Sequence, residues 1–176
     1  GLKPNRWGEA HAPGLFAPGE TACPGVHGAS RLASNSMLEV VVFSKRIMER
    51  TAEESETGSS ITPERQEVPL KLSQRKPAGS VKAPSFASLQ QLIWNNVGVM
   101  RDRDGLSRAA NTLAAWQQTL PPPTDRPSHE LHNLVLTGRL ITEAALRREE
   151  SRGAHFRSDF PQTSADWQRH IVFTAE

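Results

Sequence analysis

The apolar residues between positions 86 and 150 recur with a helical period. The first stripe, over about 86–101, consists of Leu89, Leu92, Ile93, Val97 and Met100. The second, over about 103–118, consists of Leu106, Ala109, Ala110, Leu113 and Trp116. The third, over about 128–150, consists of Leu131, Leu134, Val135, Ile141 and Ala145. Three amphipathic helices joined by short links predict an antiparallel three-helix bundle.

The first fifty residues have a different pattern. A short apolar run from Leu15 to Ala17 is closed by Pro18 and Gly19, which predicts a buried strand that ends in a turn. A Ser/Asn cluster then precedes an apolar run, which predicts a helix over 35–50. Its apolar face is formed by Met37, Val41 and either Ile47 or Met48. A strand, a loop and a helix ahead of a bundle predict an α+β chain.

Two segments are too polar to predict packed elements. Residues 51–85 contain prolines at 63, 69, 77 and 84 and few large apolar side chains, so this stretch buries too little surface to offset its ordering entropy. We expect a flexible linker there, with a short extended piece near 68–72. The tail, 153–176, is predicted to be mostly irregular. The predicted division is therefore 1–50, 51–85, 86–152 and 153–176.

The loop between the predicted strand and the first helix has the most informative composition. It runs Gly25-Val-His-Gly-Ala-Ser-Arg31 and leads directly into the helix start. A glycine-rich loop before a helix N-terminus offers N–H donors and a partial positive charge to an anion. Arg31 adds a planar fork that can bind a carboxylate at two points, although spacing alone also fits a surface arginine. His27 fits either a position near substrate or a packed loop residue.

Three segments together carry a resemblance to a known family. They are 25–39, then Leu92-Ile-Trp-Asn-Asn-Val-Gly-Val-Met-Arg101, and finally Arg148-Glu-Glu-Ser-Arg-Gly-Ala-His-Phe-Arg-Ser-Asp-Phe-Pro161. In this order they resemble the flavoprotein superfamily of L-aspartate oxidase, succinate dehydrogenase and fumarate reductase. Residues 1–50 then correspond to the C-terminal piece of an FAD-binding α/β domain, and 86–152 to the helical domain.

The resemblance implies roles for four residues. Arg31 would bind a substrate carboxylate, Glu20 would contact FAD, and Ser36 and Met37 would meet the flavin through their backbone. Taken without the resemblance, Glu20 reads as a solvated turn carboxylate and Ser36 as a simple N-cap. His155 is expected to be structural, fixing the turn after the longest helix.

Within the superfamily, the string Leu32-Ala-Ser-Asn-Ser36 favours the L-aspartate oxidase branch. That branch oxidises L-aspartate to iminoaspartate in NAD biosynthesis, with hydride passing to flavin and with oxygen or fumarate as reoxidant. Two alternatives stay open: a fragment of a succinate dehydrogenase or fumarate reductase flavoprotein, and a non-catalytic helical remnant.

A flavoprotein of this kind also needs parts that these 176 residues do not contain. No G-x-G-x-x-G follows an early strand, so the fingerprint that binds the FAD pyrophosphate is absent from this sequence. We therefore expect a C-terminal portion, inactive alone, whose partners are the N-terminal FAD-binding and capping regions. The general acid/base is expected in the capping region.

Composition narrows the remaining classes. The net charge of +2 arises from interspersed signs, which argues against nucleic acid as a partner. A single cysteine, Cys23, suits a reducing compartment, so a cytoplasmic location is expected. The sequence contains no run of about 18 apolar residues, so no membrane span is predicted. The histidines and the cysteine lack metal-ligand spacing, so no metal is expected.

Overall fold

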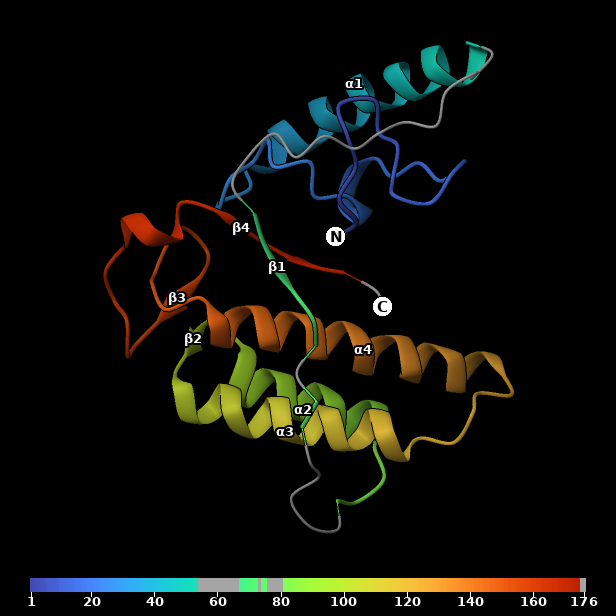
Figure 1. Cartoon of the computed structure of the whole chain (residues 1–176). Coiled ribbons are helices and arrows are strands. Elements are labelled where there is room, and N and C mark those ends of the chain that lie inside the picture. Colours follow the sequence, from blue (N-terminus) through green and yellow to red (C-terminus); the bar gives the residue numbers. More distant parts are fainter. Residues whose placement is uncertain (54–66, 73, 76–80, 175–176) are drawn as a thin grey trace. The chain divides into compact units, whose positions relative to one another are not determined.

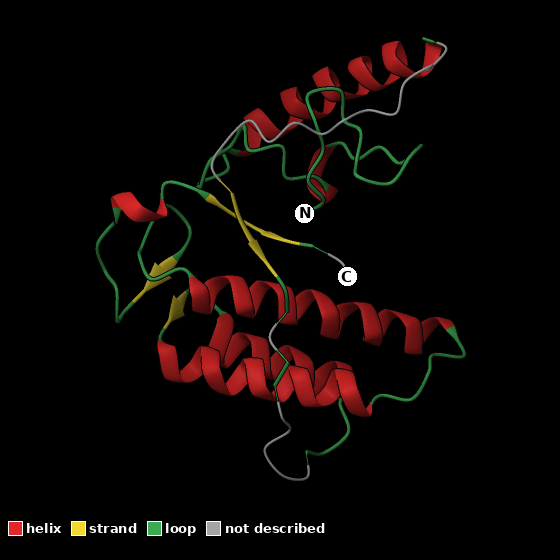
Figure 2. Ribbon diagram, in the orientation of Figure 1, coloured by secondary structure: helices red, strands yellow, loops and turns green. Residues whose placement is uncertain are grey.

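The chain combines helices with short strands and divides into two compact units, Gly1–Glu64 and Arg65–Glu176 (Figure 1). The structure is a computed structural model that describes residues 1–53, 67–72, 74–75 and 81–174, with the backbone alone for 67–70. Figure 2 shows a long helix and extensive loops in the first unit, whereas helices dominate the second unit. The predicted linker, 51–85, lies largely outside the described residues.

The first unit lacks the strand that we predicted at 14–20. Phe16 makes only an isolated antiparallel bridge with Glu9, and Gly19–Thr21 form a short 3-10 helix, η1. The Ala10 amide donates to the Leu15 carbonyl at 2.7 Å, so the segment folds back on residues just before it. The prediction failed because Pro18 has no N–H to continue a ladder and Gly19 adopts a positive φ of 67°.

Helix α1, Ala33–Ala52, begins two residues before the predicted start. Its N-cap is Leu32, which has no side chain able to cap, whereas the Ser/Asn cluster lies inside the first turns. The predicted apolar face is only partly correct, because Met37, Val41 and Met48 are exposed whereas Ile47 is half-buried beside Gly8. The residues that α1 buries are Glu39 and Phe43.

In the second unit, α2 (Phe86–Val97), α3 (Arg103–Thr119) and α4 (Arg126–Arg147) pack on one another. Their shared core consists of Leu89, Val97, Leu106, Ala109, Leu113, Trp116, Val135 and Ala145. The Trp116 indole N–H is satisfied by the Lys82 carbonyl at 2.9 Å. These buried positions belong to the stripes predicted from the sequence, which is why the helices lie close to their predicted ranges.

Local capping explains where the helices differ from prediction. Asp125 and Ser128 form a capping box, so α4 begins at Arg126 with Pro127 in its first turn, before the predicted start at 128. Helix α2 ends at Val97 instead of 101, because Gly98 leaves the helical conformation with φ −63° and ψ −144°; a Cβ there would lie 2.8 Å from the Trp94 carbonyl oxygen. Met100 and Arg101 continue as strand β2.

The buried face of α4 also differs from the predicted stripe. Leu134 and Ile141 are exposed, whereas Gly138, Arg139, Thr142 and Glu143 are buried. Glu143 is satisfied by Arg75, whose guanidinium donates to both carboxylate oxygens at 2.7 and 3.2 Å. Gly138 lies against Ile93 and Leu113, so it is the point of close approach to α2 and α3.

The strands form two separate parallel pairs. β1 (Glu67–Leu70) pairs with β4 (His170–Phe173), and β2 (Met100–Arg101) pairs with β3 (Phe156–Arg157). The tail that we predicted to be irregular therefore contains β3, β4 and the 3-10 helix η2, Ala165–Trp167. Such short strands give little signal in a sequence, because their pairing partners lie far away along the chain.

Candidate functional site

Arg31 lies immediately before α1 and already binds a carboxylate. Its Nη2 donates to Glu20 Oε1 at 3.2 Å, joining the loop before α1 to η1. The Glu20 side chain is 86% exposed and that of Arg31 is 38% exposed. An ion pair this exposed is weak, so both groups are available to a ligand. Two of the four predicted site residues are thus in direct contact.

Ser36 and Met37 lie in the first turns of α1. The Ser36 hydroxyl donates to the Ala33 carbonyl at 2.9 Å, and its amide donates to the Leu32 carbonyl at 3.3 Å. The reading of Ser36 as a simple N-cap is therefore wrong, because Leu32 holds that position. Since Leu32 cannot cap with its side chain, the first amides of α1 receive no side-chain acceptor from it. Met37 is 69% exposed to solvent.

The loop before Arg31 is shaped by two glycines and fastened by a histidine. Gly25 and Gly28 have φ values of 85° and 59°, which residues other than glycine rarely adopt. Between them, the His27 Nε2 contacts the Glu39 Oε2 on α1. Sequence reasoning missed Glu39 as part of this region. The available signal was an acidic residue inside the apolar run from Met37 to Phe43.

A second group of charged residues follows α4 and has a structural role. Arg157 is fully buried, and its Nη1 donates to the carbonyls of Ala145 and Leu146 at 2.9 and 3.1 Å. It thereby satisfies carbonyls that the end of α4 leaves open. Its Nε and Nη2 donate to Asp159 at 2.7 and 2.6 Å, and these hydrogen bonds are the main reason that the pKa of Asp159 is lowered.

Glu150 is the other fully buried charge of this group. Its carboxylate accepts from Arg148 at 2.7 Å, from Arg152 at 3.0 Å and from the Ser164 amide at 2.9 Å. Burial alone would raise the pKa of the carboxyl, but these hydrogen bonds outweigh it and lower the pKa to about 2. Glu150 therefore stays ionised and ties the turn after α4 to the tail.

His155 is held as a neutral ring within the same turn. Arg101 Nη1 donates to its Nδ1 at 3.0 Å, and its Nε2 lies 3.2 Å from the Arg148 carbonyl, where an N–H can donate. Burial, and then the charges of nearby arginines, lower the pKa of the His155 ring. These contacts join β2, through Arg101, to the segment after α4, as the structural reading of His155 expects.

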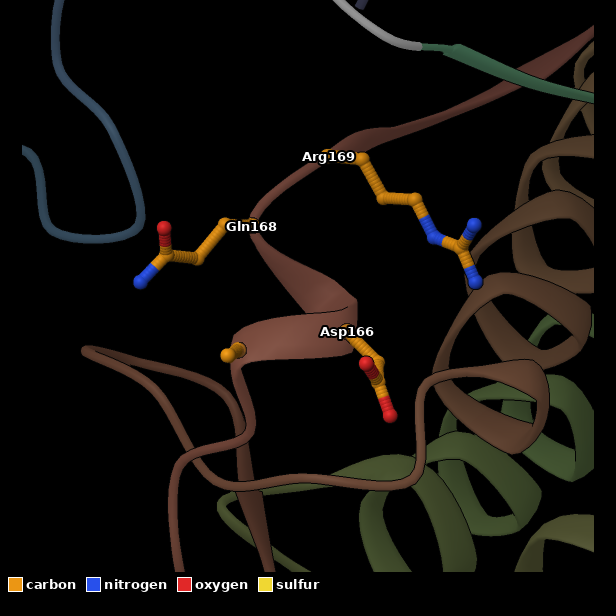
Figure 3. Close-up of a pocket in the computed structure, with 4 residues that line it drawn as sticks. Asp166, Gln168 and Arg169 are labelled. Carbon is orange, nitrogen blue, oxygen red and sulfur yellow. The ribbon is translucent and has the colours of Figure 1, made fainter.

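The described residues of the second unit also form a shallow hollow around η2, lined by Ala165, Asp166, Gln168 and Arg169 (Figure 3). The labelled side chains point in different directions and do not converge on one position (Figure 3). The hollow contains none of the predicted site residues. It therefore has no place in the candidate site.

The described part of the chain contains neither a cluster suited to a metal ion nor a helix suited to span a membrane. Across residues 1–53, 67–72, 74–75 and 81–174, no group of three or more His, Cys, Asp or Glu is arranged to hold a metal ion. No helix within the same ranges has the length and apolar character needed to cross a membrane.

Comparison with known sequences points to one kind of protein. Residues 126–176 match the family described as the fumarate reductase flavoprotein C-terminal region. Over 99% of its length, the chain is 39% identical to the L-aspartate oxidase of Bacillus subtilis (strain 168), covering 32% of that protein. It is 40% identical to the L-aspartate oxidase of Rhodospirillum rubrum, with 93% of this chain and 55% of that protein covered.

Solved structures show a related fold. A chain of the Mycobacterium smegmatis Sdh1 complex in the apo form matches 90% of this chain with a TM-score of 0.63 and 28% identity, and 29% of that chain is covered. The FrdA chain of an E. coli quinol fumarate reductase with the E245Q mutation matches 96% of this chain with a TM-score of 0.63. At 20% identity, this second match speaks for the fold alone. The chain spans about a third of the length of most of these proteins.

Proposed function

Since this chain belongs to the flavoprotein superfamily of L-aspartate oxidases and fumarate reductases and corresponds to its C-terminal portion, we propose that it forms part of an FAD-dependent L-aspartate oxidase. The observation that carries the proposal is the 39% identity to one such oxidase along 99% of the chain. The reaction would convert L-aspartate to iminoaspartate, the proposed first step toward NAD.

The residues of the first unit fit a flavin cofactor. The start of α1 has no side-chain cap, so its amides are suited to a group with partial negative charge, such as a flavin carbonyl edge. Glu20 is exposed and could accept hydrogen bonds from ribityl or ribose hydroxyls. FAD would supply the hydride acceptor, which oxygen or fumarate then reoxidises. Ser36 and Met37 would hold its ring through their backbone.

Arg31 would bind and orient the substrate. Its guanidinium holds the Glu20 carboxylate in this structure, so its position and chemistry suit a carboxylate ligand. A substrate carboxylate that displaces Glu20 from Arg31 would leave Glu20 available for the cofactor hydroxyls. Fixing one carboxylate of L-aspartate at Arg31 would orient the α-carbon relative to the start of α1.

The remainder of the site would come from the N-terminal FAD-binding and capping regions, including the general acid/base. The surface of α1 supports such a partner, because its exposed side chains include Met37, Leu38, Val41 and Met48. Exposed apolar side chains that cluster along a helix usually mark an interaction surface. A surrounding domain would bury this face and exclude water from the substrate.

In a full-length flavoprotein carrying this chain, Arg31→Leu should impair aspartate turnover far more than FAD binding. Losing a bidentate contact to a buried carboxylate costs about 2–5 kcal/mol. This predicts a fall of roughly 30-fold or more in kcat/KM, at about 1.4 kcal/mol per tenfold. Steady-state kinetics with L-aspartate and flavin stoichiometry on the same preparations test it.

Two further variants sharpen that experiment. Arg31→Lys should recover only part of the activity, because an ammonium cannot reproduce the planar fork. Arg6→Leu removes an exposed arginine of the same unit and should leave kcat/KM unchanged. Near-normal kcat/KM in the Arg31→Leu enzyme would remove Arg31 from the substrate site.

A second function is favoured by the match to the fumarate reductase flavoprotein family and by the likeness to the Mycobacterium smegmatis Sdh1 complex at 28% identity. On this alternative the same Arg31 would bind succinate or fumarate. Measuring succinate oxidation and fumarate reduction in the same full-length enzyme separates the two, because an aspartate oxidase should be faster with L-aspartate as the reductant.

We further propose the finer organisation of the chain. Residues 1–50 would be the piece of the FAD-binding domain, 51–85 a linker, 86–152 the helical domain and 153–176 the tail. The short links after α2 and α3 and the shared core support an antiparallel arrangement of α2, α3 and α4. The exposed, unpaired thiol of Cys23 supports a reducing, cytoplasmic location.

A further inference from the structure

We propose that His27 and Glu39 form a buried pair that positions Arg31 without touching the substrate. The inference rests on the proposed role of Arg31 as the substrate-carboxylate ligand. Three observations on described residues support it. The loop before Arg31 brings His27 to α1, the pair is largely buried, and the ion pair of Arg31 with Glu20 is weak.

The loop path brings His27 back to α1. Gly25 and Gly28 are both in the left-handed region, and the Gly28 amide donates to the Gly25 carbonyl at 3.4 Å, so the chain turns through His27. The His27 side chain is only 16% exposed and reaches Glu39, twelve positions further along the chain. The contact therefore closes a loop that contains Arg31 and the start of α1.

The contact between His27 and Glu39 is important because the Glu39 carboxylate is buried. The Glu39 side chain is 4% exposed, within a stretch of α1 that is otherwise apolar from Met37 to Phe43. Its other oxygen, Oε1, is buried and has no hydrogen-bond partner among the described residues. A buried carboxylate needs at least one partner, so removing His27 leaves Glu39 with an uncompensated charge. The loop is consequently held down where His27 meets Glu39.

Arg31 has no comparably strong anchor of its own. Its guanidinium donates to Glu20, which is exposed to solvent. Since exposed ion pairs contribute little, the direction of the guanidinium depends on the backbone that carries it. That backbone is fixed on one side by α1 and on the other by the His27–Glu39 pair. A positioned arginine loses less freedom when a carboxylate binds.

Trypsin tests the anchoring in the 176-residue chain itself, because it cleaves after Arg31. In His27→Ala, cleavage after Arg31 should accelerate by about tenfold relative to cleavage after Arg46, since local opening of the loop no longer breaks the pair. Arg46 lies within α1 of the same unit, so loss of the whole unit would raise both rates together. His27→Gln keeps a donor for Glu39 and should restore most of the protection.

Two exposed residues of the same unit provide matched controls for the trypsin experiment. His11→Ala removes an exposed histidine of the same unit, and Glu49→Ala removes an exposed carboxylate of α1. Neither should alter the ratio of the two cleavages, whereas Glu39→Ala should raise it as His27→Ala does. An unchanged ratio in His27→Ala would overturn the proposal.

Kinetics of a full-length flavoprotein carrying the chain form the second arm. His27→Ala and Glu39→Ala should each raise KM for L-aspartate by about tenfold at unchanged flavin content, and the double variant should be no worse than either single one. Additive losses would overturn the pair. If Arg31→Leu impairs turnover while both pair variants stay normal, the positioning role alone fails. If Arg31→Leu stays normal as well, the proposed function fails with it.

Discussion

At the scale of single residues, the environment of Glu150 decides its charge state. The carboxylate is fully buried, yet two arginines and one backbone amide keep it ionised. Because the folded pKa of about 2 lies below the ordinary value of 4.5, ionised Glu150 stabilises the fold at neutral pH. This stabilisation is complete above about pH 4.5 and is lost as the pH falls through about 2.

Glu150→Gln should therefore lower the free energy of unfolding at pH 7 by about 1.5–3 kcal/mol, the value of hydrogen bonds to a charged group. The difference from wild type should narrow as the pH falls from about 4.5 to about 2, because Glu150 itself becomes protonated there. Urea unfolding followed by circular dichroism at several pH values measures it.

The neighbouring glutamate provides the control for that measurement. Glu149 pairs with Arg103 at 2.7 Å on the surface, so Glu149→Gln should change the free energy of unfolding by less than about 1 kcal/mol. Equal effects of the two substitutions at pH 7 would show that burial of the Glu150 carboxylate does not matter.

At the scale of elements, the packing of α4 depends on a residue with no side chain. A Cβ added at Gly138 would lie 3.3 Å from Ile93 Cδ1 and 3.6 Å from Leu113 Cδ2. The glycine weakens the helix locally but lets α4 approach α2 and α3. A larger residue at this position must push the helices apart or displace core side chains.

Gly138→Leu should accordingly lower the free energy of unfolding by about 1–3 kcal/mol, the usual cost of overpacking a core. Thr137→Leu introduces the same side chain at the adjacent exposed position and should stay within about 0.5 kcal/mol of wild type. Thermal and urea unfolding of the three proteins measure both effects. A Gly138→Leu protein as stable as Thr137→Leu would refute close packing at this point.

At the scale of the whole molecule, the two units differ in how much apolar surface they bury. All members of the main core cluster belong to residues 65–176. In the described part of the first unit, the buried apolar side chains are Pro4, Ala17 and Phe43, while α1 exposes several large ones. The second unit therefore contains a core that can support folding without the first.

A protein consisting of residues 65–176 should keep cooperative unfolding, with a urea midpoint close to that of the second unit in the full chain. Circular dichroism at 222 nm gives the measurement. Leu113→Ala, which opens a cavity in this core, should shift the midpoint equally in both proteins. A broad, non-cooperative transition in the shorter protein would show that its core needs the first unit.

The sequence identified some residues of the candidate site and missed others. The resemblance selected Arg31, Glu20, Ser36 and Met37, and the structure places Arg31 in contact with Glu20. The roles of these four residues remain predictions. Glu39 was missed because a single acidic residue in an apolar run gives no indication of its partner. Only the reversal of the chain at Gly25 and Gly28 brings His27 to it.

The sequence by itself determined the family and the three helices of the second unit, because both depend on local information: motif strings and a 3.6-residue apolar period. Tertiary structure alone decided the parallel pairs β1–β4 and β2–β3, the buried Arg157 and the ionised Glu150. Each of these depends on groups that meet across long sequence separations. A buried charge is stable only beside partners that the fold supplies, and no local pattern specifies those partners.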